Sequence, residues 1–244
     1  MAESGKSSDI VRLVDIRKTY ITGELQVPVL KGINATVCRG EFVGFIGTSG
    51  SGKSTLLNIL GMLDVPTGGQ YYLEDIEVSQ FSDVEQATIR NLKIGFIFQS
   101  FNLFPHLTVE QNIEVPMLYA RVPGRIRSKR ALDLAKRVGL GHRPTQLSGG
   151  ECQRIAIARA LSNNPAFILA DEPTGNLDEK TSNEIMKLFH ELNREQGVTI
   201  VMVTHNPSLG PHYDKIIRLR DGRIDNTLFE WEIAAQKKES EAAR

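Results

Sequence analysis

The chain has 244 residues, which is long for one ordinary domain and short for two, so it admits one large α/β unit or a core with an inserted subdomain. Hydrophobic residues make up 41% of the sequence and charged residues 24%, a balance that can bury a core and excludes intrinsic disorder. Lys plus Arg equals Asp plus Glu at 29 each, so no overall charge favours nucleic acid or anionic lipid as a partner.

The cysteine content argues against disulfide-rich and zinc-binding proteins, and the length of the apolar runs argues against secreted and membrane-spanning proteins. Cys38 and Cys152 form no CxxC pair and no Cys/His cluster, which argues against a disulfide framework or a structural zinc site and fits a reducing compartment. Residues 1–9 lack the apolar stretch of a signal peptide, and the longest apolar runs, 42–47 and 198–203, are far shorter than the ~20 residues of a membrane span. We therefore expect a chain that is neither secreted nor membrane-spanning by itself.

Short apolar runs predict the strands. Residues 11–20, 29–37 and 70–76 are expected to form an antiparallel sheet layered on the core. Nearly continuous apolar or β-branched runs at 41–46, 94–98, 167–170 and 198–203 are typical of parallel strands covered on both faces. Helical patterns at 55–62, 128–138, 152–161 and 184–194 separate several of these runs. This alternation predicts an α/β fold with a doubly wound parallel sheet.

One long segment interrupts the alternation. Residues from about 99 to 162 are mainly helical in pattern and carry turn clusters at 122–124 and 139–144. We predict a helical subdomain inserted between two parts of the core, residues 1–98 and 163–230. The final residues 231–244 are charged and alanine-rich, and are predicted to form a frayed helix or a tail.

The strongest motif is GTSGSGKS, residues 47–54, which lies between a predicted strand and a predicted helix. Its glycines allow successive backbone N–H groups to curl around a phosphate at a helix N-terminus. Lys53 adds a charge for the β- and γ-phosphate oxygens, and the hydroxyl of Ser54 can bind Mg²⁺. The motif therefore predicts a phosphate-binding loop, and the alternative is a flexible Gly/Ser turn.

Two adjacent carboxylates end the predicted strand 167–170. The position places Asp171 near a metal at the carboxyl edge of the sheet and Glu172 opposite a γ-phosphate. Glu172 can then orient or deprotonate an attacking water, so we assign it the role of general base. Taken alone, an acidic pair after a strand is also consistent with a helix-capping turn.

A second glycine-containing helix start lies at LSGGE, residues 147–151. Ser148, Gly149 and Gly150 precede a helical pattern, and this arrangement can bind an anion. The alternative is an ordinary serine N-cap followed by two turn glycines.

The chain resembles an ATP-binding cassette (ABC) ATPase over essentially its whole length. The resemblance rests on the order of four features: the phosphate loop, LSGGE, Asp171-Glu172 and the strand-terminal His205. The resemblance implies a single nucleotide-binding domain with a RecA-like P-loop NTPase core. It also matches Gln99 to the family's glutamine loop, residues 175–178 to its D-loop, His205 to its switch histidine and Tyr20 to its adenine-stacking aromatic. Without the resemblance, the sequence would indicate that Tyr20 is an ordinary strand tyrosine and that Gln99 simply ends its strand.

The resemblance also implies a set of site residues, cofactors and partners. Contacts to ATP are expected from Tyr20, Gly47, Ser49, Gly50, Ser51, Gly52, Lys53, Ser54, Thr55, Gln99, Ser148, Gly149, Gly150 and Asp178, catalytic roles from Lys53, Glu172 and His205, and Mg²⁺ binding from Ser54, Gln99 and Asp171. ATP is expected between two copies of the chain in a head-to-tail homodimer. Integral membrane permease subunits, supplied by another chain, would hold the protein at the cytoplasmic face of the inner membrane, and no nucleic acid is expected.

Residues 57–67 and 173–178 resemble the branch of the family that contains macrolide-export, lipoprotein-release and cell-division cassettes. The sequence departs from that branch at 138–146, which looks shorter than in most relatives. It also differs at the end of the signature, where Glu151 is followed by Cys152 in a position at which glutamine is common. Glu151 is expected to point away from the phosphate site while backbone N–H groups bind.

Three functions remain open beside transport. They are signalling across the membrane without transport, a nucleotide-gated clamp with negligible turnover, and a DNA-repair ATPase. The last is disfavoured because fewer than a hundred residues separate Ser54 from Leu147, with no sustained heptads.

Overall fold

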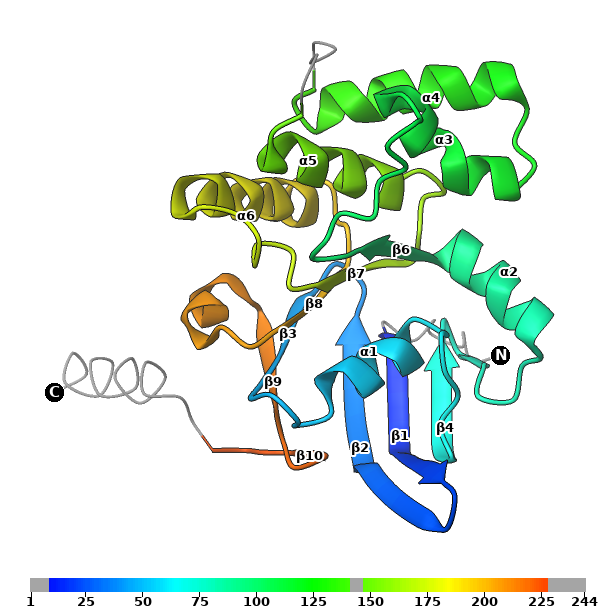
Figure 1. Cartoon of the computed structure of the whole chain (residues 1–244), viewed down its shortest axis with the longest axis vertical. Helices are drawn as coiled ribbons and strands as arrows, with labels where there is room; N and C mark the ends of the chain where they lie inside the picture. The colour runs from blue at the N-terminus through cyan, green and yellow to red at the C-terminus, as the bar shows by residue number, and fades with distance from the viewer. Residues whose placement is uncertain (1–8, 141–146, 228–244) are drawn as a thin grey trace, which may run out of the picture.

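Two β-sheets and a group of helices form the structure, a computed structural model that describes residues 9–140 and 147–227 (Figure 1). The predicted tail at 231–244 and most of the segment at 138–146 lie outside the described residues. None of the described helices is both long enough and apolar enough to cross a membrane.

The larger sheet has six strands in the order β10-β9-β3-β8-β7-β6, and all neighbours are parallel except β9 and β10. Its strands are β3 (Phe42–Gly47), β6 (Ile94–Ile97), β7 (Phe167–Asp171), β8 (Ile200–Thr204), β9 (Lys215–Arg220) and β10 (Arg223–Ile224). The four predicted parallel strands are confirmed, whereas β9 and β10 were not predicted. β8 starts two residues later than expected because the N–H of Val198 still donates to the carbonyl of Leu192 at the end of the preceding helix.

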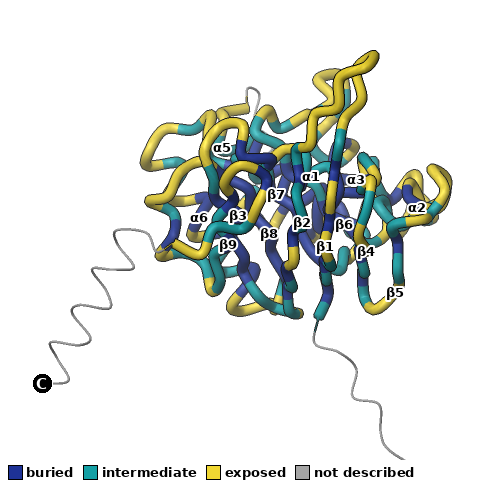
Figure 2. Tube along the Cα trace, turned by 90° about the horizontal axis from the view of Figure 1, so that it is seen from below, coloured by how far each residue is buried: buried dark blue, intermediate teal, exposed yellow. Residues whose placement is uncertain are grey.

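The parallel strands are apolar throughout because both faces of the sheet are covered. In β7, Phe167 and Leu169 face one hydrophobic cluster while Ile168 and Ala170 face another. β8 alternates in the same way. Figure 2 shows buried residues concentrated around β3, β7 and β8. Burial on two faces removes the polar alternation of a half-exposed strand.

A four-stranded antiparallel sheet, in the order β2-β1-β4-β5, covers one hydrophobic cluster together with α1 (Figure 1). Its strands are β1 (Asp9–Thr22), β2 (Leu25–Cys38), β4 (Gly68–Leu73) and β5 (Ile76–Glu77), and α1 spans Lys53–Leu60. This confirms the predicted antiparallel layer. The single strand predicted at 70–76 is wrong, because Glu74 and Asp75 take positive φ angles of 49° and 66° and turn the chain between β4 and β5.

The remaining helices lie on the other side of the large sheet or at its β6 edge (Figure 1). They are α2 (Asp83–Lys93), α3 (Val109–Tyr119), α4 (Gly124–Arg137), α5 (Gly149–Ala160), α6 (Glu179–Arg194) and the short 3₁₀ helix η1 (Pro207–His212). α3, α4 and α5 pack on one another and fall between β6 and β7 in the chain, within the segment predicted as a helical insertion. α5 and α6 begin earlier than predicted because Ser148 and Asp178 act as their N-caps.

Candidate functional site

The glycine-rich loop at 47–54 joins β3 to α1. Gly50 and Gly52 take φ angles of 78° and 100°, the left-handed region that favours glycine. Gly52 is the N-cap of α1 and offers no side-chain acceptor to the first turn of the helix. The N–H groups at this helix end are therefore uncapped by any side chain, as an anion-binding end requires. Ser49, Gly50 and Ser54 are exposed, Gly47, Lys53 and Thr55 are half-buried, and Ser51 and Gly52 are buried.

The Lys53 ammonium group lies over the loop. Its Nζ donates to the carbonyl oxygens of Gly47 and Thr48, at 2.7 and 2.8 Å. Burial lowers the pKa of Lys53, and the charges of Glu172 and Asp171 oppose that shift. Burial, aided by the Glu172 charge, raises the pKa of Asp171, and Lys53 counteracts it. One cation and two carboxylates from separate motifs are thus assembled at the carboxyl ends of β3 and β7.

The Glu172 carboxylate is held by the end of the neighbouring strand β8. Its Oε2 accepts the hydroxyl of Thr204 at 2.8 Å, and its Oε1 accepts the backbone N–H of His205 at 2.6 Å. His205 Nδ1 also lies 2.6 Å from Oε1. The side chain of Glu172 is 16% exposed, while that of His205 is 67% exposed. The structure therefore brings together two residues that are 33 positions apart in sequence.

Gln99 lies against the D-loop segment 175–178. Its Nε2 donates to Oδ1 of Asn176 at 3.2 Å, and Nδ2 of Asn176 donates to the carbonyl of Gln99 at 3.0 Å. A Cβ at Gly175 would lie 2.7 Å from Nε2 of Gln99, so the Gln99 side chain packs closely on the D-loop segment. The amide nitrogen of Gln99 is thus bound to Asn176, and no hydrogen bond from the described residues goes to its amide oxygen.

Asp178 caps α6 in its own chain. Its carboxylate accepts the N–H of Thr181 at 3.0 Å and the hydroxyl of Thr181 at 2.6 Å. These hydrogen bonds lower the pKa of Asp178. The D-loop aspartate is therefore fixed by the first turn of α6.

The LSGGE motif forms a capping box at the start of α5. Oγ of Ser148 accepts the N–H of Glu151 at 3.3 Å, and the Glu151 carboxylate accepts both N–H and Oγ–H of Ser148 at 2.8 Å. The expectation that Glu151 points away is wrong, because its carboxylate turns back to satisfy two donors on Ser148. These same bonds lower the pKa of Glu151. A Cβ at Gly150 would lie 2.7 Å from Cγ2 of Thr181, so the motif packs closely on α6.

Tyr20 is anchored on β1. Its hydroxyl donates to Oδ2 of Asp64 at 2.9 Å, and Nζ of Lys18 lies 5.0 Å from its ring centroid. The residue is 38% exposed, which leaves part of the ring accessible for stacking. Within the described residues, no hydrogen bond joins Tyr20 or Ser148 to the phosphate loop.

Sequence reasoning assigned no role to Thr204 or Asn176. The available signals were weak: a hydroxyl residue directly before His205, and an amide inside the D-loop segment. Each acquires a partner only through the fold, because β8 lies beside β7 and the D-loop lies beside Gln99.

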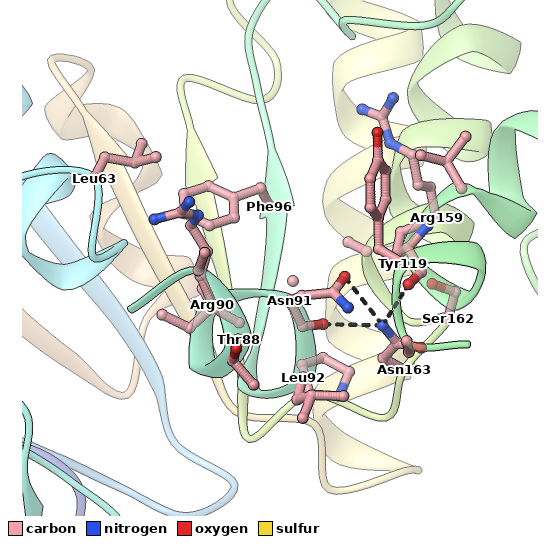
Figure 3. Close-up of a pocket in the computed structure, with 18 of the residues that line it drawn as sticks. Leu63, Thr88, Arg90, Asn91, Leu92, Phe96, Tyr119, Arg159, Ser162 and Asn163 are labelled. Atoms are coloured by element: carbon pink, nitrogen blue, oxygen red, sulfur yellow. Dashed lines mark hydrogen bonds between the residues drawn. The ribbon is translucent and has the colours of Figure 1, made fainter. Parts of the chain in front are cut away.

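Two cavities bear on function. One of about 800 Å³ lies beside the phosphate loop and is bordered by Gly47, Thr48 and His205. A larger groove of about 1070 Å³ lies away from these groups, between α2 and α3. Figure 3 shows Arg90 and Phe96 on one side of the groove and Tyr119 and Arg159 on the other.

The groove is lined by exposed apolar side chains, and hydrogen bonds join its two walls. Five of its lining residues are large, apolar and exposed: Leu63, Val84, Leu92, Phe104 and Tyr119. Asn163 joins the two walls, since its Nδ2 donates to the carbonyls of Asn91 on α2 and Pro116 on α3 at 2.9 and 3.1 Å (Figure 3). Large exposed apolar patches on proteins are often sites of protein–protein, membrane or ligand binding.

Known proteins resemble this chain along most of its length. A family described as "ABC transporter" matches residues 30–175. An uncharacterized ABC transporter ATP-binding protein of Thermotoga maritima is 55% identical over 88% of this chain and 94% of its own length. The macrolide export ATP-binding/permease protein MacB of Syntrophobacter fumaroxidans is 51% identical, and the match covers 89% of this chain but 31% of that protein.

Solved structures agree with the sequence matches. A dimeric structure of a post-hydrolysis state of the ATP-binding cassette MJ0796, bound to ADP and Pi, superimposes with a TM-score of 0.78. It is 46% identical and covers 88% of this chain and 97% of its own. The protein of that name comes from Methanocaldococcus jannaschii. The RecA-like core with its antiparallel layer and helical insertion is the fold of these cassettes, and the chain belongs to the ABC transporter family, as an ATP-binding ATPase.

Proposed function

We propose that two copies of this chain bind ATP between them, with the phosphate loop of one copy facing Ser148, Gly149 and Gly150 of the other. One chain carries both surfaces, and within the described residues no hydrogen bond links them. A head-to-tail pair supplies each ATP with both surfaces and creates two equal sites. ATP then closes the pair because each γ-phosphate is shared between copies.

The phosphate loop has the chemistry of a triphosphate site. The hydroxyl of Ser51 is buried and has no hydrogen-bond partner among the described residues. No side chain caps the N-terminus of α1, and among the described residues the Lys53 ammonium group donates hydrogen bonds only to two carbonyl oxygens. An entering triphosphate offers acceptors to these donors. Tyr20 presents its partly exposed ring to the adenine.

Mg²⁺ fits the donors near the loop. The hydroxyl of Ser54, the carboxylate of Asp171 and the amide oxygen of Gln99 are the oxygen ligands that Mg²⁺ prefers. Bound there with ATP, Mg²⁺ neutralises charge on the phosphate oxygens. The amide nitrogen of Gln99 donates to Asn176, which leaves its amide oxygen as the group that would bind Mg²⁺.

Glu172 acts as the general base for water attack on the γ-phosphate. The single observation that carries this assignment is its carboxylate, which is held by three donors at 2.6 to 2.8 Å and faces the Lys53 charge. A carboxylate in a fixed orientation can accept the proton of a bound water. The His205 side chain is exposed, so its imidazole can turn from Glu172 toward the γ-phosphate.

The test is the Glu172→Gln variant, which keeps the shape of the side chain and removes its basicity. We expect ATP binding to persist, hydrolysis to fall at least a hundredfold and a dimer to accumulate with ATP in size-exclusion chromatography. Glu179→Gln, in the first turn of α6, is the matched control and should behave as the wild type. Elution as a monomer in the presence of ATP would contradict the shared site.

The groove between α2 and α3 is proposed to receive a segment of an integral membrane permease subunit supplied by another chain. Its five exposed apolar residues need a partner with an apolar face. MacB is named as an ATP-binding/permease protein, and this chain matches 31% of its length. By this proposal the cassette sits at the cytoplasmic face of the inner membrane and binds no nucleic acid.

Co-purification from detergent-solubilised membranes tests the groove. Val84→Arg places a charge in the groove at a residue that is 76% exposed, so the fold should tolerate it while the integral membrane partner is lost. Ile126→Arg on α4 is the control, because it is 55% exposed and does not line the groove. Equal recovery of an integral membrane protein with both variants would place the interface elsewhere.

A further inference from the structure

We infer that Thr204 is a positioning residue that sets the orientation of the Glu172 carboxylate through its buried hydroxyl group. The inference rests on the proposed role of Glu172 as general base. Thr204 is the last residue of β8 and is 1% exposed. It does not belong to the phosphate loop, the D-loop or the LSGGE motif.

The direction of the Thr204 hydroxyl is fixed by two hydrogen bonds. The N–H of Asn206 donates to Oγ1 at 3.0 Å, and Oγ1 donates to Oε2 of Glu172 at 2.8 Å. A hydroxyl group has one hydrogen to donate. Because the ionised carboxylate can only accept, this hydrogen is directed at Oε2 of Glu172, and the oxygen of the hydroxyl accepts from Asn206.

The two oxygens of Glu172 have different partners. Both contacts from His205, through N and Nδ1, go to Oε1, while Thr204 is the donor to Oε2 in the described residues. Bonding both oxygens from one strand end prevents rotation of the carboxylate group. The backbone contributes too, since the N–H of Glu172 donates to the carbonyl of Val203 at 2.9 Å and Glu172 has a φ angle of 43°.

The two oxygens of Glu172 are bound by side chains that differ in mobility, those of His205 and Thr204. The side chain of His205 is 67% exposed and can turn toward a γ-phosphate, which releases its Nδ1 contact to Oε1. Thr204 is buried in the sheet and cannot follow. When the imidazole moves, the backbone N–H of His205 still binds Oε1 and the Thr204 hydroxyl still binds Oε2, so Thr204 is the side chain that keeps the carboxylate oriented.

The test compares Thr204→Val, which keeps the shape and removes the hydroxyl, with Thr204→Ser, which keeps the hydroxyl. For Thr204→Val we expect kcat to fall about tenfold, with KM for ATP within about twofold of the wild type. Thr204→Ser should restore kcat to within about twofold. The double variant Thr204→Val with Glu172→Gln should still form the ATP-dependent dimer, which shows that nucleotide binding survives.

Three outcomes would overturn the inference. They are a wild-type kcat in Thr204→Val, a Thr204→Ser variant as slow as Thr204→Val, and a rise in KM with kcat unchanged. The single variant Glu172→Gln distinguishes a failure of the general-base role of Glu172 from a failure of the positioning role of Thr204. If it hydrolyses ATP normally, the proposed base is wrong and the inference falls with it. If it is inactive while Thr204→Val is normal, only the positioning role is overturned.

Discussion

The two glycine-containing helix starts of this chain look alike in sequence and differ in structure. Gly52 begins α1 without any side-chain cap, and the loop before it contains a buried hydroxyl with no partner among the described residues. Ser148 begins α5 with a complete capping box, in which Glu151 already occupies the serine N–H and hydroxyl. One helix end has no side-chain cap, and at the other the capping box binds the N–H groups of Ser148 and Glu151, while no side chain among the described residues caps those of Gly149 and Gly150.

This difference teaches that two helix N-termini with similar sequences can differ in how many donors they leave open to an anion. At the phosphate loop no side chain caps the helix, and the loop holds a buried hydroxyl without a partner among the described residues. The α5 terminus already carries a carboxylate that offsets its positive potential. We therefore expect the phosphate loop to provide most of the affinity for ATP and the α5 terminus to act on ATP that is already bound.

The largest effect is expected from Lys53→Ala. Removing the ammonium group leaves the triphosphate without its nearest cation, and the affinity for ATP should fall at least ~100-fold. Isothermal titration calorimetry measures the loss. Lys187→Ala, at a lysine on α6 whose side chain is 79% exposed, is the control and should bind as the wild type does. Unchanged affinity in Lys53→Ala would remove the phosphate-loop assignment.

A smaller effect, on hydrolysis and not on binding, is expected from Ser148→Ala. Affinity for ATP in calorimetry should stay within about twofold, while hydrolysis by the dimer falls about tenfold and the free energy of unfolding falls by about 1 kcal/mol. Ser82→Ala is a close control, because Ser82 forms the same capping box with Glu85 on α2. It should lose similar stability and keep its hydrolysis rate. Equal hydrolysis by the two variants would show that Ser148 is only a cap.

The smallest effect is expected from Glu151→Gln, and it depends on pH. Hydrogen bonds from Ser148 lower the pKa of Glu151 below the model-compound value of 4.5, so ionised Glu151 stabilises the fold above that value. The stabilisation is lost as the pH falls through the lowered pKa. Because the group is exposed, the variant should lose less than about 1 kcal/mol at pH 7.

Urea unfolding at several pH values measures this difference. It should be constant above about pH 5.5 and disappear at acid pH, once the carboxylate is protonated. A difference that grows as the pH falls would contradict the capping role of Glu151.

The residues most readily predicted were those whose signal is local. The continuous apolar runs of β3, β7 and β8 follow from burial on both faces, and the glycines of the phosphate loop follow from the φ angles that the turn needs. α2 was not predicted because Gln86 is its one buried residue, so it has no apolar stripe. Its start is marked instead by the Ser82–Glu85 capping box.

By itself the sequence determined the fold class, the phosphate loop and the family, because these depend on periodicity and on motifs within a few residues. Only the tertiary structure decided that Thr204 holds Glu172, that Asn176 holds Gln99, and that Glu151 turns back onto Ser148. Most of these contacts join segments that are distant along the chain, and a hydrogen bond across neighbouring strands depends on strand order. Local patterns of hydrophobicity record whether a residue is buried, and they contain no information about which polar group lies beside it.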